Sequence, residues 1–128
     1  MIDRREIAAI FAGGFIGAVA RAVIADALPQ GEWPWATFAV NVAGAFALGY
    51  FATRLQERLP VSAYRRPFLG TGVCGALTTF SAMQLELLRM LDDRHWELAA
   101  GYGGASVAGG FVAVAAATNF VRRAPLLR

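Results

Sequence analysis

Four apolar segments, each long enough to cross a bilayer, occupy most of this 128-residue chain. The segments are 7–25, 35–53, 67–85 and 98–121, and only the first of them contains a charged residue, Arg21. About 20 mostly apolar residues suffice to span a membrane as a helix. With 57% hydrophobic residues and a mean hydropathy of +0.48, the chain lacks the charged surface of a soluble domain of this size. The sequence therefore predicts a single all-α membrane domain over 1–128, with helices near 7–28, 35–55, 67–91 and 98–121.

The first segment also has the layout of a secretory signal peptide. An Arg pair near the N-terminus precedes an apolar run that ends in Ala18-Val19-Ala20, which is similar to a small-residue cleavage site. However, Arg21 lies beyond that run, and Gly13 and Gly17 have the four-residue spacing that allows membrane helices to pack closely. We therefore interpret the segment as a membrane helix.

The basic residues, all arginines, are distributed unevenly. The acidic joints at 26–34 and 92–97 contain Arg94, and Arg89 lies near the second of them. The N-terminus, the joint at 54–66 and the C-terminus hold the others outside the membrane segments: Arg4, Arg5, Arg54, Arg58, Arg65, Arg66, Arg122, Arg123 and Arg128. The positive-inside rule then predicts that both termini are cytoplasmic. The net charge of +3 is thus a topology signal, and it does not indicate a nucleic-acid partner.

Small residues at a spacing of four recur in the later segments. Ala45 and Gly49 form such a pair, and Gly101, Ala105 and Gly109 form a run. This spacing predicts tight helix packing and favours an oligomer.

The third segment contains helix-breaking and hydroxyl residues at membrane depth, within the stretch 72–81. Lipid cannot satisfy an unwound backbone, so such a break is tolerated only where it is buried in protein or lines a watery cavity. The sequence therefore predicts a broken third helix at which something polar binds or passes.

Polar side chains also lie inside the second and fourth segments. Thr37 and Asn41 are four residues apart, as are Tyr102 and Ser106. A single hydroxyl often bonds back to its own helix, but an amide at mid-membrane needs a partner or water. Together with the hydroxyls of the third segment, these residues favour a shared polar pathway.

The chemistry of that pathway favours an anion. Its donors are neutral amide and hydroxyl groups, Arg21 lies near one mouth, and the acids Asp26 and Glu86 fall near the ends of their segments. Phe80 adds an aromatic edge, which is electropositive, although an isolated Phe is more often a packing residue.

Four parts of the chain are similar to the signature blocks of the Fluc (CrcB) fluoride channels. In order, they are GGFIGAVAR at 13–21, TFAVNVAGAF at 37–46, GALTTFS at 75–81, and the Gly101-Tyr102 pair with Ser106. The resemblance spans nearly the whole chain, and its blocks appear in the order and spacing of that family.

This resemblance implies a dual-topology channel of two antiparallel subunits in the bacterial cell (inner) membrane. Its implied role is passive export of cytoplasmic fluoride, which enters acid-stressed cells as HF, so the protein is not an enzyme. The implied partners are fluoride, the lipid bilayer and a second subunit. A structural Na⁺, which is not transported, would bind the main-chain carbonyls of Gly75 and Thr78. The implied fluoride pathway comprises Thr37, Asn41, Thr79, Phe80, Met83, Tyr102 and Ser106, with Arg21 in a vestibule.

Two features depart from the family pattern. Met83 stands where the family usually has a second Phe. The strong arginine asymmetry also disfavours insertion in both orientations. A homodimer is the favoured assembly, and the alternative is a heterodimer with an oppositely oriented paralogue.

Three other classes of membrane protein are alternatives. A small multidrug exporter that exchanges protons for cations needs a carboxylate inside its first helix, where this chain has Arg21. A membrane enzyme could use Ser81 or Cys74 as nucleophile, but the single histidine, His95, lies in a joint where it cannot activate either. Cys74 is better interpreted as a packing residue. The third alternative is a structural subunit without transport.

Overall fold

The computed structural model describes residues 3–29, 31–57 and 62–124, and within these ranges the regular structure is entirely helical. The elements are α1 (Arg4–Ala27), α2 (Trp35–Glu57), the wide π-helix η1 (Pro67–Cys74), the short α3 (Gly75–Leu77), α4 (Phe80–Asp92) and α5 (Trp96–Arg123). Four segments of the described chain are long and apolar enough to span a membrane, the third being Pro67–Asp92. The prediction of an all-α membrane protein is confirmed at this level.

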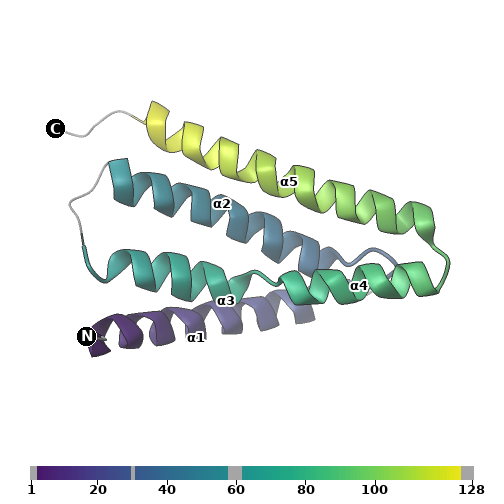
Figure 1. The fold of residues 1–128 in the computed structure, drawn as a ribbon, viewed down its shortest axis with the longest axis horizontal. Helices are drawn as coiled ribbons and strands as arrows, with labels where there is room; N and C mark the ends of the chain where they lie inside the picture. Colours follow the sequence, from purple (N-terminus) through teal and green to yellow (C-terminus); the bar gives the residue numbers. More distant parts are fainter. Residues whose placement is uncertain (1–2, 30, 58–61, 125–128) are drawn as a thin grey trace.

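The helices pack as two pairs. α1 lies along η1 and α3, and α2 lies along α5, while α4 extends beyond α3 toward the start of α5 (Figure 1). The start of α1, the end of α2, the start of η1 and the end of α5 all lie at one end of the bundle, and the α4–α5 turn lies at the other (Figure 1). The arginine-rich parts of the chain therefore gather at one end. Arg58 and Arg128, which belong to the same topology signal, lie outside the described residues.

Glycines allow α1 and η1 to touch backbone to backbone. A Cβ at Gly13 would collide with the carbonyl of Phe68, and one at Gly17 would collide with the carbonyl of Val73. The close packing predicted from the Gly13–Gly17 spacing is thus confirmed, and η1 is the helix against which it occurs.

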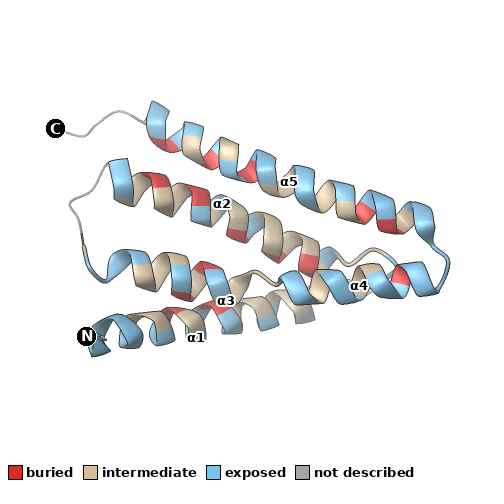
Figure 2. Ribbon diagram, viewed as in Figure 1, coloured by how far each residue is buried: buried red, intermediate tan, exposed pale blue. Residues whose placement is uncertain are grey.

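The outer faces of the bundle are apolar. Exposed residues cover the outside of each helix, while buried residues face the neighbouring helix (Figure 2). Phe11 of α1 and Phe111 of α5 are each 77% exposed. Large exposed apolar surfaces mark contacts with lipid or with another protein. Cys74, by contrast, is buried, in agreement with a packing role.

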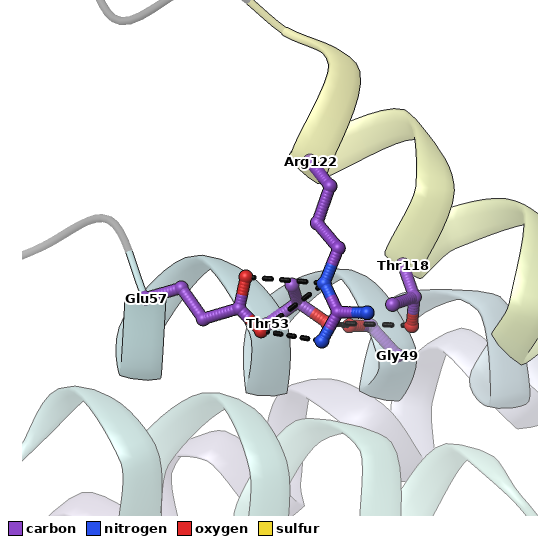
Figure 3. A network of polar contacts seen from close by, with 5 residues as sticks. All are labelled: Gly49, Thr53, Glu57, Thr118 and Arg122. Carbon is purple, nitrogen blue, oxygen red and sulfur yellow. Dashed lines mark hydrogen bonds and ion pairs between the residues drawn. The ribbon is translucent and has the colours of Figure 1, made fainter.

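A polar network joins the C-terminal halves of α2 and α5 (Figure 3). The Thr53 hydroxyl donates to the Gly49 carbonyl at 2.8 Å and lies 3.3 Å from the Thr118 hydroxyl. One turn further, the Arg122 guanidinium donates to the Glu57 carboxylate, with Nη2 2.6 Å from Oε1. We call these residues the α2–α5 network, and its ion pair connects the last turns of both helices.

Helix ends differ from the sequence prediction by a few residues. α1 begins at Arg4, three residues early, because the Asp3 carboxylate caps it by accepting from the Arg5 N–H at 2.9 Å. α5 ends at Arg123, two residues late, in the turn that the Arg122–Glu57 pair holds. Hydropathy alone does not locate such ends, because capping groups and ion pairs are charged or polar.

Candidate ion pathway

Thr78 and Thr79 are extended and separate α3 from α4. Thr78 has φ and ψ of −79° and 154°, and Thr79 has −147° and 106°. The Thr79 hydroxyl caps α4 by accepting from the Ala82 N–H at 3.2 Å. The chain thus leaves the helical conformation for two residues and re-enters it with an N-cap of its own.

The side chain of Asn41 bonds to the main chain at this interruption. Its Oδ1 accepts from the Thr79 N–H at 2.8 Å, and its Nδ2 donates to the Thr79 carbonyl at 3.1 Å. Gly44, less than one turn further along α2, faces the methyl group of Thr78 so closely that a Cβ there would collide with it. α2 therefore contacts both extended residues.

These bonds divert the donors of two carbonyl groups. In a continuous α-helix the N–H of residue i bonds the carbonyl of residue i−4, so Thr79 would donate to Gly75 and Ala82 would donate to Thr78. Here the Thr79 N–H donates to Asn41 and the Ala82 N–H donates to the Thr79 hydroxyl. The carbonyls of Gly75 and Thr78 are thus among those of residues 75–78 that have, within the described chain, no helical donor at the interruption.

Thr37, Glu86 and Tyr102 form a hydrogen-bonded group among α2, α4 and α5, which we call the Glu86 cluster. The Thr37 hydroxyl donates to Glu86 Oε1 at 2.6 Å, and the Tyr102 hydroxyl donates to Glu86 Oε2 at 2.6 Å. Thr37 and Tyr102 are buried, Tyr102 completely. Two neutral hydroxyls from different helices thus point at one carboxylate.

Glu86 is the site residue that the sequence interpretation missed, since hydropathy placed it at the end of the third segment. The spacing of residues along α4 would have identified Glu86. Thr79, Met83, Glu86 and Met90 recur at spacings of four, three and four, which puts them on one face of a helix. Met90 is buried, and Met83 packs against the core formed by Met90, Ala99 and Tyr102.

Ser106 extends the cluster along α5. It lies one turn after Tyr102, and its hydroxyl oxygen is buried with no hydrogen-bond partner among the described residues. A buried hydroxyl without a partner carries a cost that a bound ion or water would remove.

Two cavities flank the contact between Thr37 and Glu86. One, of about 280 Å³, is lined by Arg21, Thr37 and Thr79 among mostly alanine neighbours. The other, of about 320 Å³, is lined by Glu86 together with Trp33 and residues of the α4–α5 turn. Thr37 lines the first cavity and Glu86 the second, so their hydrogen bond joins a lining residue of each.

The structure thus gathers most, but not all, of the predicted pathway residues. Thr37 and Tyr102 bond Glu86, and Asn41 bonds Thr79. Met83 packs against the core that contains Tyr102, and Ser106 lies one turn after Tyr102 on α5. Phe80 is not part of this group, because it is 69% exposed on the surface of the chain.

Comparison with known proteins gives consistent matches. Residues 8–118 match the family described as "CrcB-like protein, Camphor Resistance (CrcB)". A protein of Mycolicibacterium paratuberculosis named fluoride-specific ion channel FluC 1 is 59% identical, over 98% of this chain and 97% of the relative. FluC 1 of Mycobacterium bovis is 58% identical over the same shares. The fluoride-specific ion channel FluC of Chlorobium luteolum is 40% identical over 80% of this chain and 81% of the relative.

Proposed function

Because this chain belongs to the CrcB-like family, we propose that it is a subunit of a fluoride-selective channel in the inner membrane of a bacterial cell. The family match covers most of the chain, so the resemblance inferred from the signature blocks is confirmed. The proposed activity is passive export of cytoplasmic fluoride, which lowers fluoride toxicity. The protein is a channel and not an enzyme.

The observation that carries this proposal is the pair of buried hydroxyls in the Glu86 cluster. Thr37 and Tyr102 donate to the same carboxylate, and so they form a preformed donor pair for an anion. Fluoride holds its water tightly, and a narrow track of donors must replace that hydration shell. In this structure the Glu86 oxygens occupy the place where an anion would accept both bonds.

The two cavities give the route a direction. Fluoride entering the cavity beside Arg21 meets a cation together with the hydroxyls of Thr37 and Thr79. It then takes the donors of Thr37 and Tyr102 as the Glu86 side chain moves aside. Ser106 continues the track, since its buried hydroxyl is able to donate.

A second subunit would complete the pathway at Phe80. Its ring lies on the surface of the single chain, where an antiparallel partner is able to cover it. The ring edge is electropositive and adds a donor of another kind to the track. Met83, at the position of the family's second Phe, is the side chain in which this pathway differs from the family pattern. We therefore propose a dual-topology homodimer with two pathways.

The arginine distribution supports one alternative assembly. The described arginine-rich ends all lie on one side of the bundle, and such asymmetry favours one orientation. In the alternative, an oppositely oriented paralogue is the partner and supplies the second Phe.

We also propose that a structural Na⁺ binds at the interruption between α3 and α4. The carbonyls of Gly75 and Thr78 have lost their helical donors, and carbonyl oxygens suit a hard cation. Each unsatisfied carbonyl in a membrane costs roughly several kcal/mol. A cation between two subunits would satisfy four of them, the Gly75 and Thr78 carbonyls of each subunit. The ion balances the main chain and does not cross the membrane.

Fluoride efflux from liposomes tests the function. Purified protein is reconstituted into vesicles loaded with potassium fluoride, and efflux is followed with a fluoride electrode after addition of a potassium ionophore. The expected result is rapid fluoride release, with little release from vesicles loaded with chloride. Comparable chloride and fluoride currents, or no current, would contradict the proposal. Parallel measurement of proton-driven uptake of cationic drugs tests the exporter alternative.

A further inference from the structure

We propose that Asn41 is a positioning residue that fixes the interruption between α3 and α4. It supports conduction indirectly, by holding the main chain of Thr79 in place, and its main role is not to bind the ion. The inference rests on the proposed function, because it concerns the same pathway and the same sodium site. It changes the role of Asn41, which the family resemblance placed among the pathway donors.

The first argument is the geometry of the amide. Asn41 bonds the N–H and the C=O of one residue, Thr79, with its own oxygen and nitrogen. A rotated amide would bring donor against donor and acceptor against acceptor, so these two bonds fix which way it points. One N–H of the amide remains, whereas the oxygen and the other N–H are used by the main chain.

The second argument comes from the same helix. Gly44 leaves the space that the Thr78 methyl group occupies. Asn41 and Gly44, three residues apart on α2, therefore fit Thr79 and Thr78 respectively. Helix α2 thus contacts both extended residues: it bonds Thr79 by hydrogen bonds, and it leaves space for the side chain of Thr78.

The third argument is what happens without Asn41. The Thr79 N–H and carbonyl would then lose the side chain that bonds them, so Thr79 would be free to exchange between the extended and the helical conformation. Each residue added to a helix turns the following chain by about 100°. The bond between Asn41 and Thr79 therefore holds the carbonyls at the interruption in place for a cation and sets the direction of Phe80.

Amide hydrogen exchange at Thr79 is the direct test. In the wild-type channel this N–H is bonded to Asn41, and we expect it to exchange slowly. In Asn41→Leu, which has similar size and no polar atoms, we expect exchange at Thr79 to accelerate about tenfold, the loss of roughly one hydrogen bond. Asn41→Asp is the matched control, because a carboxylate oxygen still accepts from the Thr79 N–H while its charge opposes an anion. Both variants should conduct poorly, but only Asn41→Leu should lose the protection.

Sodium binding supplies a second readout that does not depend on flux. Equilibrium binding of radioactive Na⁺ to the purified dimer should weaken about tenfold or more in Asn41→Leu, because the carbonyls at the interruption are no longer held in place. Gly44→Ala, which displaces Thr78 and leaves Asn41 in place, should weaken Na⁺ binding as well. Tyr102→Phe removes a pathway donor that bonds Glu86 rather than the interruption, and it should reduce flux with unchanged Na⁺ binding.

The outcomes separate the inference from the function. Wild-type protein that conducts fluoride, with Asn41→Leu unchanged in Thr79 exchange and in Na⁺ binding but impaired in flux, would make Asn41 an ion ligand and overturn the inference. Wild-type protein that shows the expected exchange and sodium behaviour but no fluoride flux would contradict the function and leave the positioning role supported.

Discussion

Two glutamates in this chain bond to helix α5 in contrasting ways. Glu57 in the α2–α5 network pairs with the Arg122 guanidinium, and both side chains are well exposed. Glu86 bonds to the neutral hydroxyls of Thr37 and Tyr102, which are buried, and it lines a cavity. The same residue type is thus tied to a cation in one region and to exchangeable donors in the other.

The difference teaches which polar contacts are able to serve transport. A guanidinium paired with a carboxylate at a surface connects two helices. It gains no binding energy by exchanging the carboxylate for a halide. Hydroxyls that donate to a carboxylate are equally able to donate to a small anion that replaces it. We therefore expect substitutions in the Glu86 cluster and beside it to change flux, and matched substitutions elsewhere to leave flux unchanged.

Two exposed phenylalanines give the largest expected contrast. Phe80→Ile keeps apolar bulk but removes the polarised ring edge that we propose a second subunit covers, and we expect fluoride flux to fall about 100-fold or more, the size of roughly 2.7 kcal/mol in the barrier. Phe111→Ile is the control, because Phe111 of α5 is also highly exposed. Liposome efflux measures both, and gel filtration verifies assembly. Normal flux in Phe80→Ile would reduce Phe80 to a packing residue.

The two glutamates themselves provide the next contrast. In Glu86→Gln the hydroxyls of Thr37 and Tyr102 face a neutral acceptor, which binds them less strongly than a carboxylate does. Fluoride then competes more easily, and we expect the fluoride concentration for half-maximal current to fall about tenfold. Glu57→Gln should change this concentration less than about twofold, because exposed ion pairs contribute little free energy. Equal effects of the two substitutions would remove the distinction between the regions.

Thr37→Val tests the stability of the cluster. It replaces a hydroxyl by a methyl group of the same shape and leaves one Glu86 oxygen without its donor. Hydrogen bonds to charged groups are worth about 1.5–3 kcal/mol, and we expect a loss of about 2 kcal/mol in the free energy of unfolding. Reversible unfolding in mixed micelles measures the change. A loss in the free energy of unfolding well below about 1 kcal/mol would mean that water replaces the Thr37 hydroxyl.

The sequence predicts the helices and the family, but it does not predict the centre of the site. The helices follow from apolar runs, which are local, and the close packing of Gly13 and Gly17 follows from their spacing. The contact between Thr37 and Glu86 joins residues 49 positions apart, and hydropathy treats Glu86 as the end of a span. Only the packing of α4 between α2 and α5 turns that carboxylate inward.

The role of Asn41 was hidden for a related reason. An amide at mid-membrane predicts a polar partner, but not whether that partner is an ion or a main chain. The structure places the Thr79 main chain against it, because the extended Thr78 and Thr79 turn their peptide groups toward α2. Extended residues inside an apolar segment leave only a weak pattern of glycines and hydroxyls in the sequence.

Thr118→Val should have the smallest effect and completes the comparison with Thr37→Val. The Thr53 hydroxyl already donates to the carbonyl of Gly49 on its own helix, so it keeps its donor bond when the Thr118 hydroxyl is removed. Hydrogen bonds between membrane helices average about 0.6 kcal/mol, and we expect a loss in the free energy of unfolding no larger than this. Flux should stay within about twofold of wild type, because the network binds no passing ion. A loss of stability or flux equal to that of Thr37→Val would place the α2–α5 network in the pathway and would break the distinction between the two glutamates.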